Sequence, residues 1–456
     1  MHLTLASAAA GIDLTQSWIG YAAIGMFVLA YVAVVLEELI HVPKSKPVLL
    51  AAGVMWMLVA LASNGDHAVE EAARHNLLEY AELLLFLLVA MTYVNALEER
   101  NVFDALRSWM VRRGYSLRKI YWVTGLLAFV ISPVADNLTT AMLMCAVVMA
   151  VGGQHPRFVG LACINVVVAA NAGGAFSPFG DITTLMVWQE GKVDIAEFLW
   201  LLPPSVVSWL VPAVVMSFVV GSDKPPALTE SIVPKRGGLR IVGLFLLTLM
   251  TAVFFHAGLH LPPVLGMMTG LGFLGLFGIW LKRTYSRSYI AQKYGLTEDE
   301  VAHNEQLGNI VPFDVFGNVA RSEWDTLLFF YGVVMCVGAL GHIGYLELLS
   351  HLMYDQLGAT WANIGVGVAS AIVDNIPVMF AVLSMDPAMD HGQWLLVTLT
   401  AGTGGSLLSI GSAAGVALMG LSKGKYTFWG HLKWAPVIGV GYAASVAVHL
   451  AVNAMR

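Results

Sequence analysis

Long apolar stretches, separated by short polar loops, fill most of this chain. A stretch of roughly 20 apolar residues can cross a bilayer as a helix. Continuous stretches of this kind lie near residues 18–39, 47–62, 76–96, 200–220, 239–256, 263–281, 323–341 and 434–452. They predict an all-α polytopic membrane protein without a sizeable soluble domain. The residues before Trp18 lack the Lys/Arg-rich start of a secretory signal, so we expect 18–39 to be a retained first span.

Four further apolar stretches are interrupted near their middle. Residues 119–151 and 358–388 are each broken by an Asp-Asn step, and residues 158–190 and 392–421 are each broken by a Gly-rich polar stretch. Such breaks leave backbone groups unpaired, which the hydrocarbon region tolerates only where protein or a water-filled cavity satisfies them. The four interrupted stretches are therefore predicted to hold the working site.

The interrupted stretches match one another in pairs, as an internal repeat would. The segment SPVADNLTTAMLM aligns with SAIVDNIPVMFAV, and this pairs Asp136-Asn137 with Asp374-Asn375. The segment NAGGAFSPFGDITT aligns with GTGGSLLSIGSAAG, and this pairs Gly173, Gly174 and Gly180 with Gly404, Gly405 and Gly411. Amphipathic stretches follow the same order, at 97–114 and 192–199 in one half and at 342–356 and 422–433 in the other. The predicted divisions are N-terminal spans 1–75, a first half 76–220, linking spans with a cytoplasmic connector 221–322, and a second half 323–456.

Composition supports the membrane assignment. Of the 456 residues 58% are hydrophobic and 12% charged, whereas a soluble domain carries about 25% charged residues. The net charge of -6 gives no footprint for nucleic-acid binding. The three cysteines, Cys145, Cys163 and Cys336, lie in apolar segments without the spacing of a zinc site, so we expect them to be packing residues.

The positions of Lys and Arg predict the topology. If the two Asp-Asn segments are re-entrant hairpins and the two Gly-rich segments are broken transmembrane helices, the chain crosses about ten times. All cations except Arg74, Lys192 and Arg456 then fall on one side, which the positive-inside rule makes cytoplasmic. Both termini are then non-cytoplasmic, and the two halves are antiparallel. This inverted-topology repeat with broken helices and a midplane site is typical of secondary transporters.

The residues at the breaks have the chemistry of a small-cation site. Sodium prefers oxygen ligands, and a hairpin tip offers free carbonyls beside its carboxylate, amide and hydroxyl groups. A buried carboxylate is costly when ionised and empty, so a proton and a cation compete for it. We assign proton binding to Asp136 and Asp374, and sodium to these two and to Asn137 and Asn375. The full predicted cation-binding set is Asp136, Asn137, Thr139, Thr140, Asn171, Ser177, Asp181, Asp374, Asn375, Thr403, Ser406, Ser409 and Ser412. The residues predicted to unwind the crossings are Gly173, Gly174, Pro178, Gly180, Gly404, Gly405 and Gly411.

These assignments have structural alternatives. Asp136 and Asp374 could simply cap the half-helices that follow them, since Asp is a favoured N-cap. Asp181 is ambiguous, because its aligned position is Ser412, and it could be a cap or an interface residue. Ionisable residues within a membrane are functional by default, and the repeated Asp-Asn favours an ion-binding role. The thirteen histidines receive no role.

At these motifs the sequence resembles the NhaD family of bacterial sodium/proton antiporters, in the ion transporter superfamily that also contains arsenite, citrate and dicarboxylate carriers. The segments that carry the resemblance are SPVADNLTTAMLM, GGAFSPFGDITTLMVWQ and DNIPVM, with HVPKSKP as weaker support. The resemblance implies a homodimer in the bacterial inner membrane, with a scaffold and a mobile transport part that moves like an elevator. In the related dicarboxylate carriers the tips read Ser-Asn-Thr, whereas here they read Asp136-Asn137-Leu138-Thr139 and Asp374-Asn375-Ile376-Pro377.

The function expected from these observations is exchange of sodium, or lithium, for protons, exporting sodium without a cofactor or a catalytic residue. Two fixed carboxylates would repel an anion, but a dicarboxylate, citrate or arsenite carrier of the same superfamily is the nearest alternative. An intramembrane protease is disfavoured, because HExxH is absent and PFGD at Asp181 lacks the first Gly of Gly-x-Gly-Asp. A channel would need neither the repeat nor the paired acids.

Overall fold

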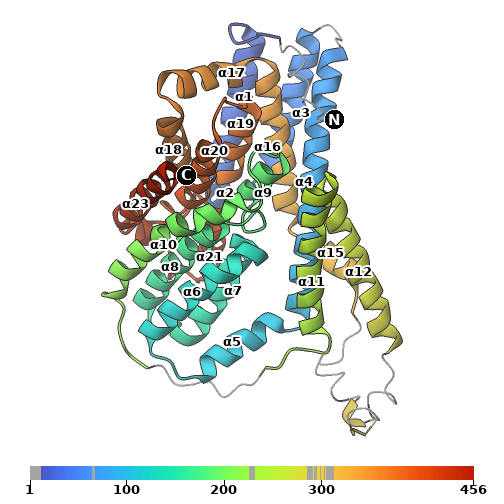
Figure 1. Ribbon diagram of the computed structural model, residues 1–456, viewed down its shortest axis with the longest axis vertical. Coiled ribbons are helices and arrows are strands. Elements are labelled where there is room, and N and C mark those ends of the chain that lie inside the picture. Colours follow the sequence, from blue (N-terminus) through green and yellow to red (C-terminus); the bar gives the residue numbers. More distant parts are fainter. Residues whose placement is uncertain are drawn as a thin grey trace. The chain divides into compact units, whose positions relative to one another are not determined.

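The described part of the chain is built from helices. The computed structural model describes residues 12–63, 67–224, 232–284 and 313–455, with short pieces between 291 and 303, and no strand occurs among them (Figure 1). Nine helices in these ranges are long and apolar enough to span a membrane. The predicted all-α class is confirmed. Residues 304–312 of the predicted connector lie outside the described residues.

The continuous apolar stretches each form one principal helix. Their bounds are α1 (Trp18–Val35), α3 (Ser45–Ala62), α4 (His67–Glu99), α10 (Leu202–Ser217), α11 (Gly238–Val253), α12 (Pro263–Arg283), α16 (Trp324–His342) and α23 (Ala435–Ala454). The largest difference from the expected bounds is at α4, which begins nine residues before the predicted 76–96 span. Its polar first turns carry an exposed i,i+4 pair, Arg74 to Glu70 at 2.8 Å, which adds modestly to helix stability.

Each interrupted stretch forms two helices, as predicted. The bounds are α6 (Leu117–Ala135) and α7 (Asn137–Gly152), α8 (Pro156–Gly174) and α9 (Ile182–Gln189), α18 (Ala359–Ser370) and α19 (Asn375–Met385), and α20 (His391–Gly404) and α21 (Ala413–Leu421). The partners α6 and α7 pack side by side, as do α18 and α19. The Asp-Asn breaks are therefore sharp, whereas the Gly-rich breaks leave seven or eight residues outside any helix, at 175–181 and 405–412.

Short helices occupy the predicted amphipathic stretches. They are α5 (Val102–Arg112), the 3₁₀ helix η1 (Glu197–Leu201), α17 (Tyr345–Ser350) with the π-helical turn η3 (His351–Gln356), and α22 (Phe428–Leu432). The remaining short helices are α2 (Glu37–Ile40), the π-helical turn η2 (Phe254–Gly258) and α15 (Val315–Ala320).

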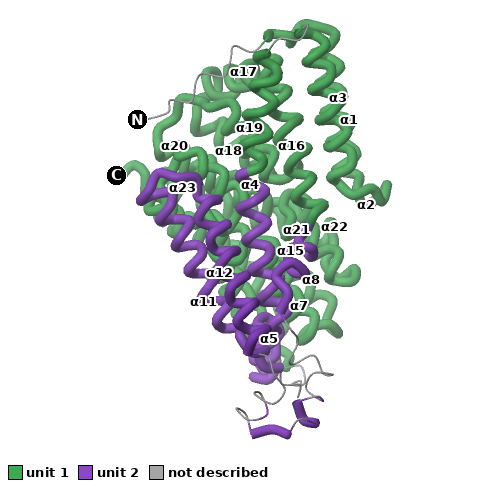
Figure 2. Tube along the Cα trace, turned by 90° about the vertical axis from the view of Figure 1, so that its right-hand side faces the viewer, with its two compact units in different colours: residues 1–81, 116–225, 324–456 green, residues 82–115, 226–323 purple. Residues whose placement is uncertain are grey.

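The chain divides into two compact units, coloured in Figure 2. Unit 1 comprises residues 1–81, 116–225 and 324–456 and holds all four interrupted stretches. Unit 2 comprises residues 82–115 and 226–323, where the Tyr93 hydroxyl donates to the Gly270 carbonyl (2.7 Å) and ties α4 to α12. The repeat boundaries proposed from the sequence remain a prediction, because one compact unit can combine segments of both halves.

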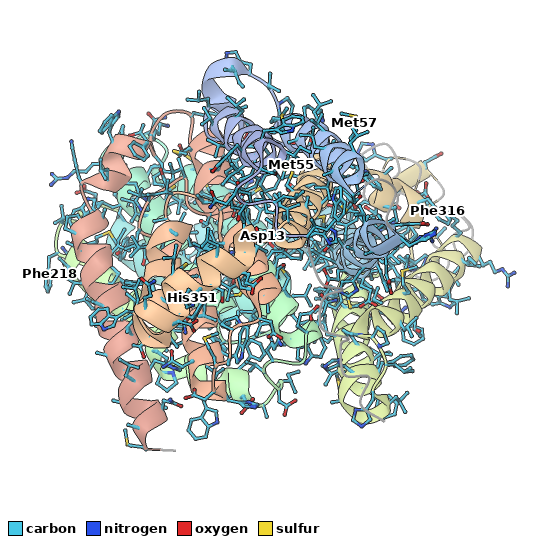
Figure 3. The ribbon with its side chains drawn as sticks, turned by 90° about the horizontal axis from the view of Figure 1, so that it is seen from above. Asp13, Met55, Met57, Phe218, Phe316 and His351 are labelled. Atoms are coloured by element: carbon cyan, nitrogen blue, oxygen red, sulfur yellow. The ribbon has the colours of Figure 1, made fainter. Side chains whose placement is uncertain are left out.

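In unit 1, helix α3 has one buried face and one exposed face, although both are apolar. It packs on α1 and α16, and its buried positions recur three or four residues apart. Met55 is fully buried, whereas Met57 is 54% exposed, and Figure 3 shows Met57 on the outer side of the helix. An outer face that is itself apolar fits a helix whose other surroundings are lipid.

Aligned positions make the same contacts in α6–α8 and in α18–α20. The Ser132 hydroxyl donates to the Ala170 carbonyl (2.6 Å), and the aligned Ser370 hydroxyl donates to the Ala401 carbonyl (2.8 Å). A side chain at Gly173 would collide with the Phe129 carbonyl. In the second half, one at Gly404 would collide with the Gly367 carbonyl, at the position aligned with Phe129. The pair α6 and α8 and the pair α18 and α20 are thus held together by equivalent contacts.

Candidate cation site

The first Asp-Asn step forms the tip between α6 and α7. Asp136 has φ +54° and ψ 163°, a backbone conformation that residues with a Cβ rarely adopt. Its carboxylate accepts hydrogen bonds from the backbone N–H and the hydroxyl of Thr139, both at 2.8 Å. Asp136 therefore does cap α7, and the predicted ligand Thr139 is bound to it. The cap at Asp136 is therefore formed at the cost of a strained backbone.

The break between α8 and α9 places Asp181 in the interior. This carboxylate is 4% exposed, and its Oδ1 caps α9 by accepting from the Thr183 N–H (3.2 Å). Ser412, the aligned residue, caps α21 with nearly the same backbone angles (φ −146°, ψ 148°, against −149° and 150°). Asp181 is thus both a cap and, through its second oxygen, available to other groups.

The amides of both tips converge on this second oxygen. Asp181 Oδ2 accepts from the amide nitrogen of Asn137 (3.0 Å) and from that of Asn375 (2.9 Å). Asn137 and Asn375 are 8% and 3% exposed, so these hydrogen bonds are shielded from water. One buried carboxylate therefore links the two Asp-Asn motifs, which lie more than 230 residues apart in the chain.

Asn171 extends the network to the second broken helix. Its Oδ1 accepts from the Asn137 amide (3.1 Å), and its own amide nitrogen donates to the hydroxyls of Ser406 (2.9 Å) and Ser412 (3.0 Å). All four residues are buried. The structure thus brings together six of the predicted ligands: Asn137, Asn171, Asp181, Asn375, Ser406 and Ser412.

Asp374 lies at the second tip, between α18 and α19, and differs from Asp136. Its side chain makes no cap hydrogen bond, and its buried Oδ1 accepts none within the described ranges. The N–H groups of Asn375 and Ile376 lie near enough to stabilise its negative charge. Its Oδ2 lies 3.9 Å from Lys44 Nζ. The alternative that Asp374 simply caps the following half-helix therefore has no cap hydrogen bond to support it at α19.

Three carboxylates belong to this region. Asp136 and Asp374 both lie near enough to Asp181 for their charges to act on it. In the described part of the chain, however, no three acidic, His or Cys side chains are grouped tightly enough to ligate one ion. The buried hydroxyls of Thr140 and Thr183 have no hydrogen-bond partner among the residues that the structure describes. A cation here would need these neutral oxygens as well as carboxylates.

Three predicted ligands point elsewhere. The Ser177 hydroxyl donates to the Pro133 carbonyl (2.7 Å), the Thr403 hydroxyl donates to the Leu399 carbonyl of its own helix (2.7 Å), and the Ser409 hydroxyl meets the Met419 sulfur (3.3 Å). Of the residues predicted to unwind the helices, Gly173, Gly174 and Gly404 still lie at the ends of α8 and α20, whereas Gly180, Gly405 and Gly411 lie in the non-helical segments. The aligned Gly174 and Gly405 make equivalent contacts. A side chain on either would collide with the carbonyl of the second glycine of its break, Gly180 or Gly411. Pro178 lies in the non-helical segment 175–181.

One residue beside the network had no assigned role. His431 on α22 is fully buried between the Tyr426 hydroxyl (2.8 Å, at Nδ1) and the Ser406 carbonyl (2.9 Å, at Nε2). Because a carbonyl only accepts, Nε2 carries the proton and Nδ1 accepts from Tyr426. Burial lowers the pKa of His431 to about 4, so the ring stays neutral and fixes the backbone at Ser406. No motif or spacing in the sequence indicates this contact.

Comparison with known proteins places these features in a family. The profile of the CitMHS family, described as "Citrate transporter", matches residues 10–287 and 311–402. The chain is 61% identical over 98% of its length to the Na(+)/H(+) antiporter NhaD of Alkalimonas amylolytica, covering 94% of that protein. It is 58% identical over 99% of its length to NhaD of Vibrio cholerae, covering 96% of that protein. The chain belongs to the NhaD antiporter family.

Membership of the NhaD family confirms the resemblance drawn from the motifs and makes the protein a transporter rather than an enzyme. A more distant relative, sodium/proton antiporter 1 of Arabidopsis thaliana, is 32% identical over 94% of the chain and is covered over 72% of its own length. The apolar helices agree with an integral membrane protein.

Proposed function

We propose that the protein exports sodium, or lithium, in exchange for protons, and that Asp136, Asp374 and Asp181 are the acidic groups of its site. The observation that carries this proposal is the convergence of Asn137 and Asn375 on Asp181 Oδ2. Relatives of more than half identity are named Na⁺/H⁺ antiporters. Competition between a proton and sodium for the same carboxylates couples the two fluxes.

The polar groups suit a hard monovalent cation. The amide nitrogens of Asn137 and Asn375 are used by Asp181, so their amide oxygens remain to face an ion together with the carboxylates of Asp136 and Asp374. In the described part of the chain, the hydroxyls of Thr140 and Thr183 have no hydrogen-bond partner that an ion would have to displace. Sodium and lithium prefer such oxygen ligands, whereas an anion such as citrate would face three carboxylates at once. No cofactor enters this scheme.

The architecture proposed for this exchange is an inverted repeat with about ten crossings. Its support is the recurrence of the Ser132 and Ser370 bonds, of the Gly173 and Gly404 contacts, and of the cap angles at Asp181 and Ser412. In this scheme α6–α7 and α18–α19 are re-entrant hairpins that enter from opposite sides. Both termini lie outside the cytoplasm, and the protein works as a homodimer with elevator-type movement in the bacterial inner membrane.

Asp136→Asn and Asp374→Asn test the site in everted vesicles. Each amide keeps the size of the carboxyl but cannot release and rebind a proton as a carboxyl group does. Sodium-dependent dequenching of a pH dye should therefore be abolished while the protein still inserts. Asp386→Asn is the matched control, because Asp386 is an exposed carboxylate with φ +40°, where Asn is well tolerated. It should exchange normally. Near-normal exchange in Asp136→Asn and Asp374→Asn would refute the assigned roles.

A further inference from the structure

A lysine from the loop before α3 reaches the second tip. Lys44 Nζ lies 3.9 Å from Asp374 Oδ2 and 4.7 Å from the centre of the Phe329 ring. Only 19% of the Lys44 side chain and 16% of the Asp374 side chain are exposed, so water screens the pair weakly. The ammonium therefore sits between an aromatic face and the predicted cation-binding carboxylate.

The neighbouring acid, Asp325, lies within electrostatic range of Lys44 but takes its side-chain hydrogen bonds from other residues. Asp325, one turn before Phe329 on α16, accepts hydrogen bonds from the Ser45 hydroxyl and from Lys46 Nζ, the latter at 3.0 Å. The Lys44 backbone N–H is bound separately, by Glu37 (3.3 Å). The two lysines of the HVPKSKP loop thus have different acidic partners, Lys44 the buried one and Lys46 the more exposed one.

We propose that the Lys44 ammonium is the resident counter-ion of Asp374 when the site holds no ion, and that sodium displaces it. This proposal rests on the assignment of Asp374 as a sodium ligand. An ionised carboxylate with an unpartnered buried oxygen is costly. The tethered ammonium offsets part of that cost, and sodium must compete with it for Asp374.

Among the described residues, the cation that acts on Asp374 is Lys44. Asp181, which caps α9, and the buried Tyr31 hydroxyl on α1 are within electrostatic range of Asp374, and neither carries a positive charge. Lys44 therefore weakens the attraction of the site for a second cation, and its removal should strengthen sodium binding. A purely structural lysine would have the opposite effect or none.

Lys44→Gln and Lys44→Met test this, with sodium-dependent proton flux measured at one fixed alkaline pH. Loss of the competing charge is expected to lower the KM for sodium about tenfold, which is 1.4 kcal/mol, with little change in kcat. Lys44→Arg should keep the wild-type KM. Lys46→Gln is the matched control, because it removes a lysine of the same loop that pairs with Asp325, and it should leave the KM unchanged.

Restoring the charge chemically gives a second test, which does not depend on whether the Lys44→Gln and Lys44→Met variants fold normally. Lys44→Cys should show the lowered KM, and attachment of an aminoethyl group to the thiol should raise it back, whereas a neutral reagent of similar size should not. An unchanged or raised KM in the neutral variants, or equal effects of both reagents, would overturn the proposal. The role of Asp374 is tested separately. Full exchange in Asp374→Asn would show that Asp374 is not a sodium ligand, whatever the result for Lys44.

Discussion

The backbone of Asp136 and that of Asp374 differ although the sequence aligns them. Asp136 has φ +54°, whereas Asp374 has φ −41°. A residue with a Cβ is strained at the first and not at the second, and the strain costs about 1–3 kcal/mol. The two tips are therefore related by sequence without being equal in this conformation.

Glycine substitutions measure that difference. Asp136→Gly and Asp136→Ala should both abolish exchange, but the glycine variant should be the more stable by about 1 kcal/mol, because glycine adopts positive φ freely. At Asp374 the order should reverse, since glycine there only adds entropy to the unfolded chain. Thermal unfolding in detergent reads both comparisons. An Asp136→Ala variant at least as stable as Asp136→Gly would show that Asp136 is not strained.

Candidate site residues could be predicted where the internal repeat duplicates them. They could not be predicted where they depend on contacts between residues far apart in the sequence. The duplicated Asp-Asn doublet identified Asp136 and Asp374, and with them the two asparagines. Asp181 stayed ambiguous because its aligned partner is Ser412, and only the fold shows that two tip amides meet on its carboxylate. Lys44 precedes Asp374 by 330 residues, a separation over which no local pattern indicates a contact.

At the scale of elements, the breaks depend on glycines that allow close approach. A Cβ at Gly404 would meet the Gly367 carbonyl, and this backbone atom cannot move aside as a side chain can. Gly404→Ala should push α20 away from α18 and shift segment 405–412, where Ser406 and Ser412 bind Asn171. We expect a loss of about 1–3 kcal/mol in stability and a strong reduction of exchange in vesicles.

The control is Gly53→Ala on α3, where a Cβ would meet nothing within 4 Å. It should leave exchange unchanged and add up to about 1 kcal/mol of helix stability. Equal behaviour of Gly53→Ala and Gly404→Ala would contradict the argument that close backbone contact positions the break.

Element positions followed closely from the sequence, because hydropathy and the Asp-Asn and Gly-rich breaks act locally. All four interrupted stretches are broken where predicted. The early start of α4 was missed because its first turns are polar, and a pair such as Glu70–Arg74 stabilises a helix without adding to its hydropathy. The direction in which Ser177, Thr403 and Ser409 point also depends on packing that no periodicity reports.

At the scale of the molecule, the question is whether the transported substrate is an anion or a cation. The family profile is described by citrate, whereas relatives of more than half identity are named for sodium and protons. The three acidic groups of the candidate site, Asp136, Asp181 and Asp374, favour the cation, because citrate would bring further negative charge to them. The central claim is therefore that sodium and protons occupy the same carboxylates in turn.

Proton release on sodium binding tests that claim most directly. Purified protein in weakly buffered detergent solution is mixed with sodium, lithium, potassium or citrate over a series of pH values, and a pH dye follows the released protons. Sodium and lithium should release protons from the wild type, citrate should not, and the double variant Asp136→Asn/Asp374→Asn should release none. Sodium binding without proton release, or unchanged release from the double variant, would contradict the account.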